Sequence, residues 1–354
     1  MTDPHAAGPR DEGAHVVVFG DVIDDVIVTP AGDIRPDTDT TARIERHAGG
    51  SAANAAAWFG HLGCRVDFLG HVNADDVTRH DALLRQHGVT PHLVGVELPT
   101  GTIVVILQPD RTRTMLTERG ANALTSPRDV DRALLRPGTH LHFTGYSVFG
   151  ARTADAVAAF AALVHDAHAA GASVSVNPGS AGFIAEHGVE GLLAATSGAD
   201  VLLPNLDEGR VLTGHTEPDD IVSALLEHYD VVALTLGREG VLAASRGRDR
   251  RDGASGPRAA DPLPGVRVRV PSIPVTPVDT TGAGDAFGAA FVQALLSSGP
   301  ARAETIDLSR LEAAALAGVR AAAVAVTRSG ARPPVSAARK PRVADLPADP
   351  KLVP

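Results

Sequence analysis

Short apolar runs alternate with longer amphipathic segments through most of the chain. Such runs, ended by glycine or polar residues, are typical of buried strands, and apolar residues spaced three and four apart are typical of helices. We expect strands at 15–20, 65–70, 141–145, 173–176, 201–203 and 231–236. We expect helices at 51–58, 75–87, 153–170, 191–197, 287–295 and 311–326. The order of strands and helices predicts an α/β fold with a mostly parallel central sheet covered by helices on both faces.

Two segments do not follow this order. Residues 26–47 alternate between apolar and polar positions around Pro30 and Pro36, as a hairpin does. Residues 102–108 and 113–117 predict a second strand pair. We expect a small separate β-sheet built from segments at about 26–47 and 92–119.

Three stretches lack the large apolar residues that a core needs. Residues 1–14 and 336–354 are polar, the second being rich in proline, and 245–266 is rich in Arg, Asp, Gly and Pro. We expect a disordered N-terminal tail, a C-terminal tail and a mobile surface insertion, because these segments cannot bury enough surface to order themselves. Residues 15–335 are long enough for one large domain or two smaller ones.

Composition and charge exclude several classes of protein. The 354 residues have a formal net charge of −10, which argues against nucleic acid or an anionic membrane as the main partner. Cys64 is the only cysteine, so the chain can form neither an internal disulfide nor a cysteine zinc cluster. The N-terminus is not a signal peptide, and no stretch of about eighteen apolar residues occurs. We therefore expect a soluble, cytoplasmic protein.

Lysine usage restricts how phosphate can be bound. The two lysines, Lys340 and Lys351, both lie in the C-terminal tail. A Walker A loop, the nucleotide-binding strand of protein kinases and a core Schiff base each need a lysine within the domain, so all three are excluded. Arginine side chains and backbone amides must therefore contact any bound phosphate.

The most informative stretch is Asp279-Thr280-Thr281-Gly282-Ala283-Gly284-Asp285-Ala286-Phe287, which predicts a tight loop that opens a helix. The first amides of a helix lack intrahelical partners and lie at the positive end of its dipole. Gly282 and Gly284 let phosphate oxygens approach these amides closely. Asp285 then stands beside the phosphate as a base for a hydroxyl nucleophile. A capped helix, with Asp285 favoured only by the dipole, is the structural alternative.

Polar residues also follow the first predicted strand. Gly20-Asp21-Val22-Ile23-Asp24-Asp25 does not match the G-x-G-x-x-G turn of dinucleotide-binding folds. Because ligands of open α/β sheets bind at the carboxyl edge, Asp24 or Asp25 can accept hydrogen bonds from sugar hydroxyls, with a solvated turn as the alternative. Further on, Gly49 and Gly50 precede a helix that places Asn54 one turn in.

Asn205 and Glu208 come directly after the strand at 201–203. Their spacing puts both side chains on one face at the start of a helix. An amide and a carboxylate there can hold water on Mg²⁺ beside ATP phosphates. A helix with an acidic first turn is the alternative explanation.

Four motifs, in this order, resemble the ribokinase (PfkB) family of carbohydrate kinases over about residues 15–335. They are Gly49-Gly50 with Asn54, Asn205-x-x-Glu208, the loop Thr235-Leu236-Gly237-Arg238-Glu239-Gly240, and the loop 279–287. The resemblance implies a ribokinase-like fold, a small sheet that acts as a lid, and transfer of the γ-phosphoryl group of ATP to a primary hydroxyl of a small sugar.

The resemblance also assigns roles to single residues. The catalytic base is Asp285, and the backbone of Gly282, Ala283 and Gly284 forms the anion hole. The sugar is held by Asp25, Gly49, Gly50 and Asn54. The nucleotide with Mg²⁺ is held by Asn205, Glu208, Thr235 and Gly237, Glu208 acting on the metal through water. Carbonyls at Asp279, Thr281, Ala325 and Gly330 hold a monovalent cation such as K⁺. Lids of two subunits often pair, which implies a homodimer.

The acceptor stays open. Ribokinases have an Asn-x-Asp pattern where this chain has Ile23-Asp24-Asp25, and a lysine where it has Ser51. Ile23 offers no hydrogen bond, and this departure argues against ribose itself as the acceptor. Fructose, 2-keto-3-deoxygluconate and nucleosides are other acceptors in the family. A ketoacid would favour Arg113 or Arg119 near its carboxylate, and a nucleoside would favour stacking on Phe149. A non-catalytic sugar or nucleotide sensor on the same fold is the alternative from another class.

Overall fold

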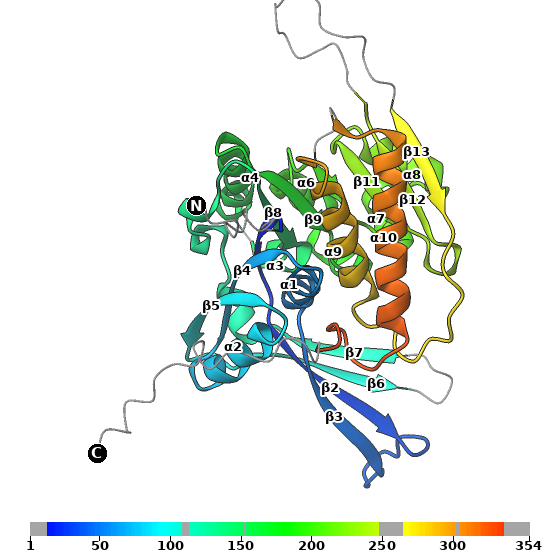
Figure 1. Ribbon diagram of the computed structural model, residues 1–354. Coiled ribbons are helices and arrows are strands. Elements are labelled where there is room, and N and C mark those ends of the chain that lie inside the picture. Colours follow the sequence, from blue (N-terminus) through cyan, green and yellow to red (C-terminus); the bar gives the residue numbers. More distant parts are fainter. Residues whose placement is uncertain (1–12, 108–112, 152, 248–264, 302–304, 336–354) are drawn as a thin grey trace, which may run out of the picture.

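The structure, a computed structural model, describes residues 13–107, 113–151, 153–247, 265–301 and 305–335 (Figure 1). The N-terminal tail up to residue 12, most of the predicted insertion at 245–266 and the tail from residue 336 lie outside the described residues.

One large sheet organises the described part of the chain. Its spatial order is β13-β12-β11-β10-β9-β8-β1-β4-β5. The neighbours from β5 to β11 pair in parallel, and β11, β12 and β13 pair antiparallel. The strands are β1 (His15–Phe19), β4 (Arg65–Asn73), β5 (Val89–Val96), β8 (Thr139–Thr144), β9 (Ser173–Asn177), β10 (Val201–Leu202), β11 (Val231–Thr235), β12 (Val241–Ser245) and β13 (Val266–Val270). The predicted strands and the mostly parallel sheet are confirmed.

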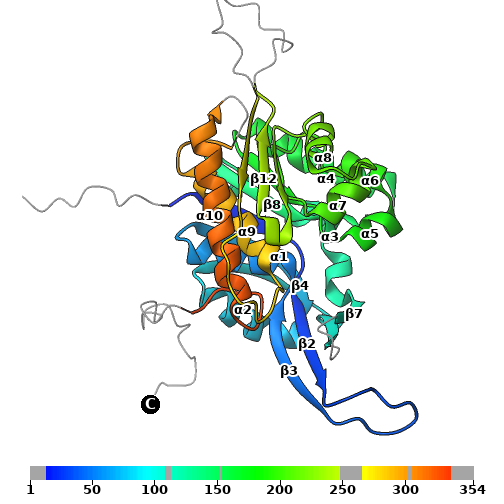
Figure 2. The same ribbon diagram turned by 90° about the vertical axis from the view of Figure 1, so that its right-hand side faces the viewer.

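Helices cover both faces of this sheet, as predicted (Figure 2). Helices on the first face are α1 (Ser51–His61), α2 (Val77–Arg85), α9 (Ala283–Leu296) and α10 (Leu308–Val326). Helices on the second face are α3 (Gly145–Val148), α4 (Ala154–Ala169), α5 (Ala181–His187), α6 (Val189–Ala195), α7 (Leu206–Thr213) and α8 (Pro218–Leu225). Short 3₁₀ turns are η1 (Ala74–Asp76), η2 (Gly120–Leu124), η3 (Pro127–Asp129), η4 (Arg132–Leu134) and η5 (Gly237–Glu239). No helix among the described residues is long and apolar enough to cross a membrane.

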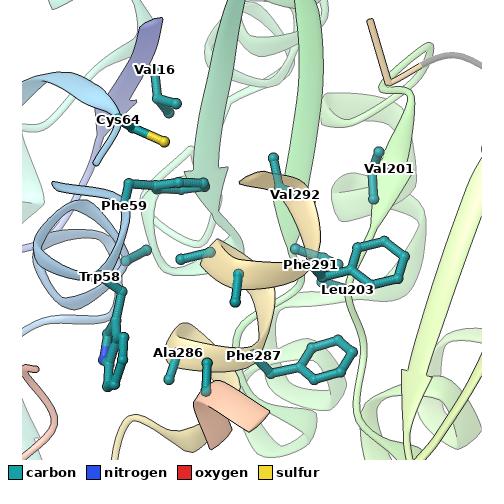
Figure 3. Close-up of a cluster of buried hydrophobic side chains, with 14 of the residues drawn as sticks. Val16, Trp58, Phe59, Cys64, Val201, Leu203, Ala286, Phe287, Phe291 and Val292 are labelled. Atoms are coloured by element: carbon teal, nitrogen blue, oxygen red, sulfur yellow. The ribbon is translucent and has the colours of Figure 1, made fainter. Parts of the chain in front are cut away.

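The core follows the alternation of strand side chains. Val16 lies beside Cys64 and Phe59 of α1, and Phe291 of α9 lies beside Leu203 in the same core (Figure 3), whereas Val17 belongs to the core of the opposite face. Small residues let the helices approach closely. A Cβ at Gly318 of α10 would lie 2.6 Å from the ring of Phe287 in α9. This packing fixes α9, whose first turn holds the predicted base.

A second, four-stranded sheet projects from the edge of the large one (Figure 1). Its order is β3-β2-β6-β7, with β2 and β6 parallel and the outer pairs antiparallel. The strands are β2 (Ile23–Pro30), β3 (Ala42–Gly49), β6 (Gly101–Leu107) and β7 (Arg113–Glu118). The small separate sheet is therefore present, and we call it the lid sheet.

One boundary of the lid prediction was wrong. Residues 92–96 belong to β5, which pairs with β4 at the edge of the large sheet, so the second lid segment begins only at Gly101. Pro91, His92 and Gly95 interrupt this strand. An edge strand of this kind lacks the continuous apolar run by which buried strands are identified.

Candidate active site

The carboxyl ends of the parallel strands meet at one edge of the large sheet, which is where open α/β sheets bind ligands. Three residues separate the end of β1 from the start of β2, so the lid sheet begins at this edge. The first turns of α1 and α9 meet there too, since Ser51 contacts Asp285. The predicted site residues therefore gather between the large sheet and the lid sheet.

Asp285 is the centre of this site. Its buried carboxylate accepts hydrogen bonds from Ser51 Oγ at 2.6 Å and from Asn54 Nδ2 at 3.1 Å. Burial raises the pKa of Asp285 to about 7, helped by the charges of Asp21 and Asp25 and opposed by the two hydrogen bonds. A carboxylate with a pKa near neutrality can both accept and release a proton, as a general base must.

The loop before α9 keeps its backbone open toward the site. Gly282 adopts a left-handed φ of 74°, and a Cβ there would lie 2.4 Å from the Cβ of Ala331, so the position requires glycine. A Cβ at Gly284, in contrast, would meet nothing within 4 Å. The first turn of α9 thus has free space beside Gly284, where an anion could approach.

Asp279 holds this loop against the chain that follows α10. Its carboxylate accepts hydrogen bonds from the amide of Thr281 at 2.9 Å and the amide of Gly330 at 3.1 Å. The amide of Asp279 also bonds to the carbonyl of Val326, beside Ala325. The positions predicted for a monovalent cation are therefore neighbours. Among the described residues no cluster of His, Cys, Asp or Glu could hold a metal, so such a cation would depend on carbonyl oxygens.

Of the two carboxylates at the start of the lid sheet, Asp25 faces the site. A Cβ at Gly49 would lie 2.1 Å from Asp25 Oδ2, so this packing requires glycine. Burial and neighbouring carboxylates raise the pKa of Asp25 to about 7. Asp24 instead pairs with Arg79 at 2.6 and 2.8 Å and with His80. Although burial opposes ionisation, these contacts hold the pKa of Asp24 well below its usual range. Asp25 is thus the carboxylate available to a ligand.

Asp21 is a residue of this site that the sequence motifs did not identify. Its buried carboxylate accepts hydrogen bonds from the amides of Ser51 at 2.7 Å and Ala52 at 3.2 Å, and from Thr144 Oγ1 at 3.3 Å. The N-cap residue of α1 is Gly50, which has no side chain to bond these amides. Asp21 therefore caps α1 from outside the helix and fixes the turn that holds Asp285.

Asn205 and Glu208 share one face at the start of α7, as predicted. Each side chain accepts a hydrogen bond from the amide of the other at 2.9 Å, which is a capping box. Burial raises the pKa of Glu208 to about 8, and Asp285 is among the charges that add to the shift. Glu208 therefore lies in the same electrostatic environment as Asp285, with acceptor capacity left for metal-bound water.

The predicted nucleotide loop lies beside this pair. Thr235 ends β11 and forms a parallel bridge with Asn205. Gly237 adopts a left-handed φ of 57°, with nothing within 4 Å of the position of a Cβ. Thr235 thus borders the Asn205–Glu208 pair, and Gly237 follows it two residues later along the chain.

Two of the three residues predicted to contact an acidic or aromatic acceptor, Phe149 and Arg119, already have partners within the chain. Phe149 stacks on Phe183 with ring centroids 5.8 Å apart and contacts His187 at 5.2 Å. Arg119 donates a hydrogen bond to the carbonyl of Tyr146 at 2.9 Å. Arg113 begins β7, and its side chain lies outside the description.

Comparisons with known proteins identify the fold and the family. Residues 14–338 match the model of the pfkB family carbohydrate kinases. The chain belongs to this family. The predictions of a ribokinase-like fold and of a kinase are therefore confirmed.

Relatives of this pfkB family member include an ATP-dependent ribose-1-phosphate kinase from Halopiger xanaduensis, 30% identical over 77% of this chain and 82% of that protein. Similar solved structures include an adenosine kinase from Sinorhizobium meliloti, with a TM-score of 0.71, 23% identity and coverage of 90% and 96% of the two chains. A ribokinase from Thermotoga maritima gives a TM-score of 0.67 and 23% identity, with 90% and 94% covered. Both structures share the fold of this pfkB kinase.

We predict that Asp21→Ala weakens both folding and turnover. The change leaves the amides of Ser51 and Ala52 without their partner, which should lower the free energy of unfolding by about 1–3 kcal/mol and shift the turn that holds Asp285. Urea unfolding and turnover measure the two effects. Asp307→Ala is the matched control, because Asp307 caps α10 far from the site. A loss of stability alone in Asp21→Ala, as in the control, would contradict the positioning role.

We predict opposite pH dependences for activity and stability. Catalysis needs ionised Asp285, so kcat/KM should fall as the pH drops below about 7 and approach about a tenfold loss per pH unit well below that value. Because the pKa of Asp285 in the folded protein lies above the usual aspartate value of 3.8, the folded protein binds the proton more tightly. This contribution to stability declines as the pH rises from 3.8 to about 7. Activity profiles and urea unfolding across this range test both signs. A kcat/KM that does not change between pH about 5 and 8 would contradict the prediction.

Proposed function

We propose that this pfkB kinase transfers the γ-phosphoryl group of ATP to a primary hydroxyl of a small carbohydrate. The observation that supports this most directly is the contact between Asp285 and Asn54. It joins the loop that can receive phosphate to the helix expected to hold the acceptor. A phosphate and a hydroxyl bound at these two places would meet at one carboxylate.

In this proposal each element has one task. Asp285 accepts the proton of the hydroxyl as its oxygen bonds to the γ-phosphorus, and the bond from this phosphorus to the β,γ-bridging oxygen breaks, so that ADP leaves. The amides from Gly282 to Asp285 stabilise the charge that develops. The acceptor is oriented by Asp25, Gly49, Gly50 and Asn54. Asn54 Oδ1 is buried with no hydrogen-bond partner in the described structure, so a sugar hydroxyl can donate to it. Closure of the lid sheet would exclude water, which otherwise competes for the phosphoryl group.

The nucleotide and the metals are assigned to the opposite side of Asp285. Thr235 and Gly237 contact the nucleotide, and Asn205 with Glu208 holds Mg²⁺ through water. Bound Mg²⁺ would neutralise phosphate charge. Carbonyls at Asp279, Thr281, Ala325 and Gly330 would hold K⁺. Turnover with K⁺ replaced by a larger organic cation at constant ionic strength measures that contribution.

The choice of acceptor is tested with a panel of neutral and anionic compounds. Neutral members are ribose, fructose, sorbitol and adenosine, and anionic members are ribose 1-phosphate, fructose 6-phosphate, gluconate and 2-keto-3-deoxygluconate. The name of the Halopiger relative supports including ribose 1-phosphate. The stacking of Phe149 on Phe183 argues against adenosine. ADP release coupled to any member would support a kinase, and binding without turnover would support a sensor.

We predict that Asp285→Asn abolishes most turnover and keeps the fold. Losing the base should lower kcat by about 10²-fold or more, while acceptor binding stays near that of the parent protein. Asp207→Asn is the matched control, because Asp207 stands in the first turn of α7 but is exposed. Turnover of Asp285→Asn close to that of the control would remove Asp285 from the mechanism.

We further propose that the lid sheet pairs with that of a second copy. Ile44 and Leu116 are 61% and 57% exposed. Their cross-strand partners, Val28 and Val104, place them on one face of the sheet. An apolar face of this kind is covered at low cost by its own copy.

We predict that Leu116→Asp converts a dimer to a monomer in analytical ultracentrifugation, because a carboxylate would be buried in the interface. Leu124→Asp, at an exposed leucine outside the lid sheet, is the control and should remain dimeric. A parent protein that sediments as a monomer at micromolar concentration would refute the pairing.

A further inference from the structure

The turn after α10 connects three parts of the site. The carbonyl of Ala331 accepts a hydrogen bond from Trp58 Nε1 in α1 at 3.0 Å, and the amide of Gly330 bonds to Asp279. Arg332 follows, and its Nη2 donates to the carbonyl of Gly49 at 3.3 Å. Arg332 thereby contacts the end of β3, where Gly49 is predicted to hold the acceptor. The turn that carries Arg332 is not among the segments predicted to bind the acceptor.

Two donor atoms of Arg332 have no partner. The residue as a whole is half-buried, but Nε and Nη1 are shielded and find no hydrogen-bond acceptor in the described structure. Burial lowers the pKa of Arg332 to about 10, so the group stays charged at neutral pH. A shielded cation with free donors is costly, because water no longer compensates its charge.

Arg310, another shielded arginine of this protein, has a structural role and serves as a comparison. Arg310 donates to the carbonyls of Leu295 at 3.1 Å, Thr305 at 2.9 Å and Gly299 at 2.7 Å. Its donors are thus occupied by the chain itself. Arg332 has one such carbonyl, at Gly49, and differs from Arg310 because Gly49 is a residue predicted to hold the acceptor.

The nearby carboxylates do not explain Arg332 either. Asp24 is occupied by Arg79. Asp25 attracts Arg332 most strongly, yet none of the described hydrogen bonds joins the two side chains. Asp25 packs against the Cα of Gly49, and Arg332 binds its carbonyl, so the two charges flank one residue. A ligand at Gly49 would meet both an acceptor of hydroxyl protons and a donor to anions.

We propose that Arg332 binds an anionic group of the acceptor, a phosphate ester or a carboxylate, so that the preferred substrate is a sugar phosphate or a sugar acid. This inference rests on the proposed function, because it assigns the acceptor to Gly49 and Asp25. The guanidinium group suits both anions, since its planar donors match paired oxygens. Asp25 then remains available to accept hydrogen bonds from the hydroxyl groups of the same acceptor molecule.

The test measures kcat/KM for each phosphorylated or acidic member of the panel and for its neutral counterpart. The parent protein should prefer one anionic member at least about tenfold, and Arg332→Gln should reduce that preference about 10- to 100-fold, mainly through KM. A preference for a phosphate ester would indicate that Arg332 binds phosphate, and a preference for gluconate would indicate that it binds a carboxylate. Arg328→Gln is the matched control, because Arg328 is exposed in the same turn.

Arg332→Lys serves as a second variant should the glutamine disturb folding. Lysine keeps the charge but not the planar donors, so it should restore part of the preference. An equal preference in the parent protein and in both variants would overturn the role of Arg332 while leaving the kinase intact.

Calorimetric binding without ATP separates this inference from the proposed function. If no panel member is phosphorylated, the proposed function fails. Tighter binding of an anionic member that is lost in Arg332→Gln would still support the role of Arg332. Equal binding by the parent protein and the variant would overturn it.

Discussion

The arrangement of the whole site depends on the hydrogen bonds that Ser51 and Asn54 donate to Asp285. They join residues 234 and 231 positions apart in the sequence and set α1 against the first turn of α9. Asp21 fixes the same turn of α1 from the end of β1. The position of the candidate base is therefore determined by buried polar contacts, and the packing of α9 on α10 prevents it from shifting.

This arrangement brings several carboxylates together in a buried environment. Asp21, Asp25 and Asp285 each have a raised pKa, with burial as the first cause and the other carboxylates as further causes for Asp25 and Asp285. Such crowding is unfavourable for folding and typical of sites that bind or move protons. It persists because the apolar core on both faces of the large sheet stabilises the elements that present these groups.

Much of this could be predicted from the sequence, because the informative patterns are local. Apolar runs identified most strands, and glycines before an apolar-periodic run identified the loop at Gly282. Asp21, Arg332 and β5 were missed for physical reasons. Asp21 caps a helix 30 residues away, and Arg332 reaches a strand end 283 residues away, so neither contact leaves a local pattern. The strand β5 is an edge strand interrupted by polar residues and proline.

The acceptor end of the site contains no lysine. Ser51, in the first turn of α1, donates a hydrogen bond to Asp285 without adding charge. Since residues 15–335 contain no lysine, any permanent positive charge that a side chain of the domain supplies to the acceptor must come from an arginine. Arg79 is bound to Asp24 and Arg119 to a carbonyl, whereas Arg332 keeps shielded donors without partners. Charge balance at the acceptor end therefore depends on Arg332 and on the ligand that it meets.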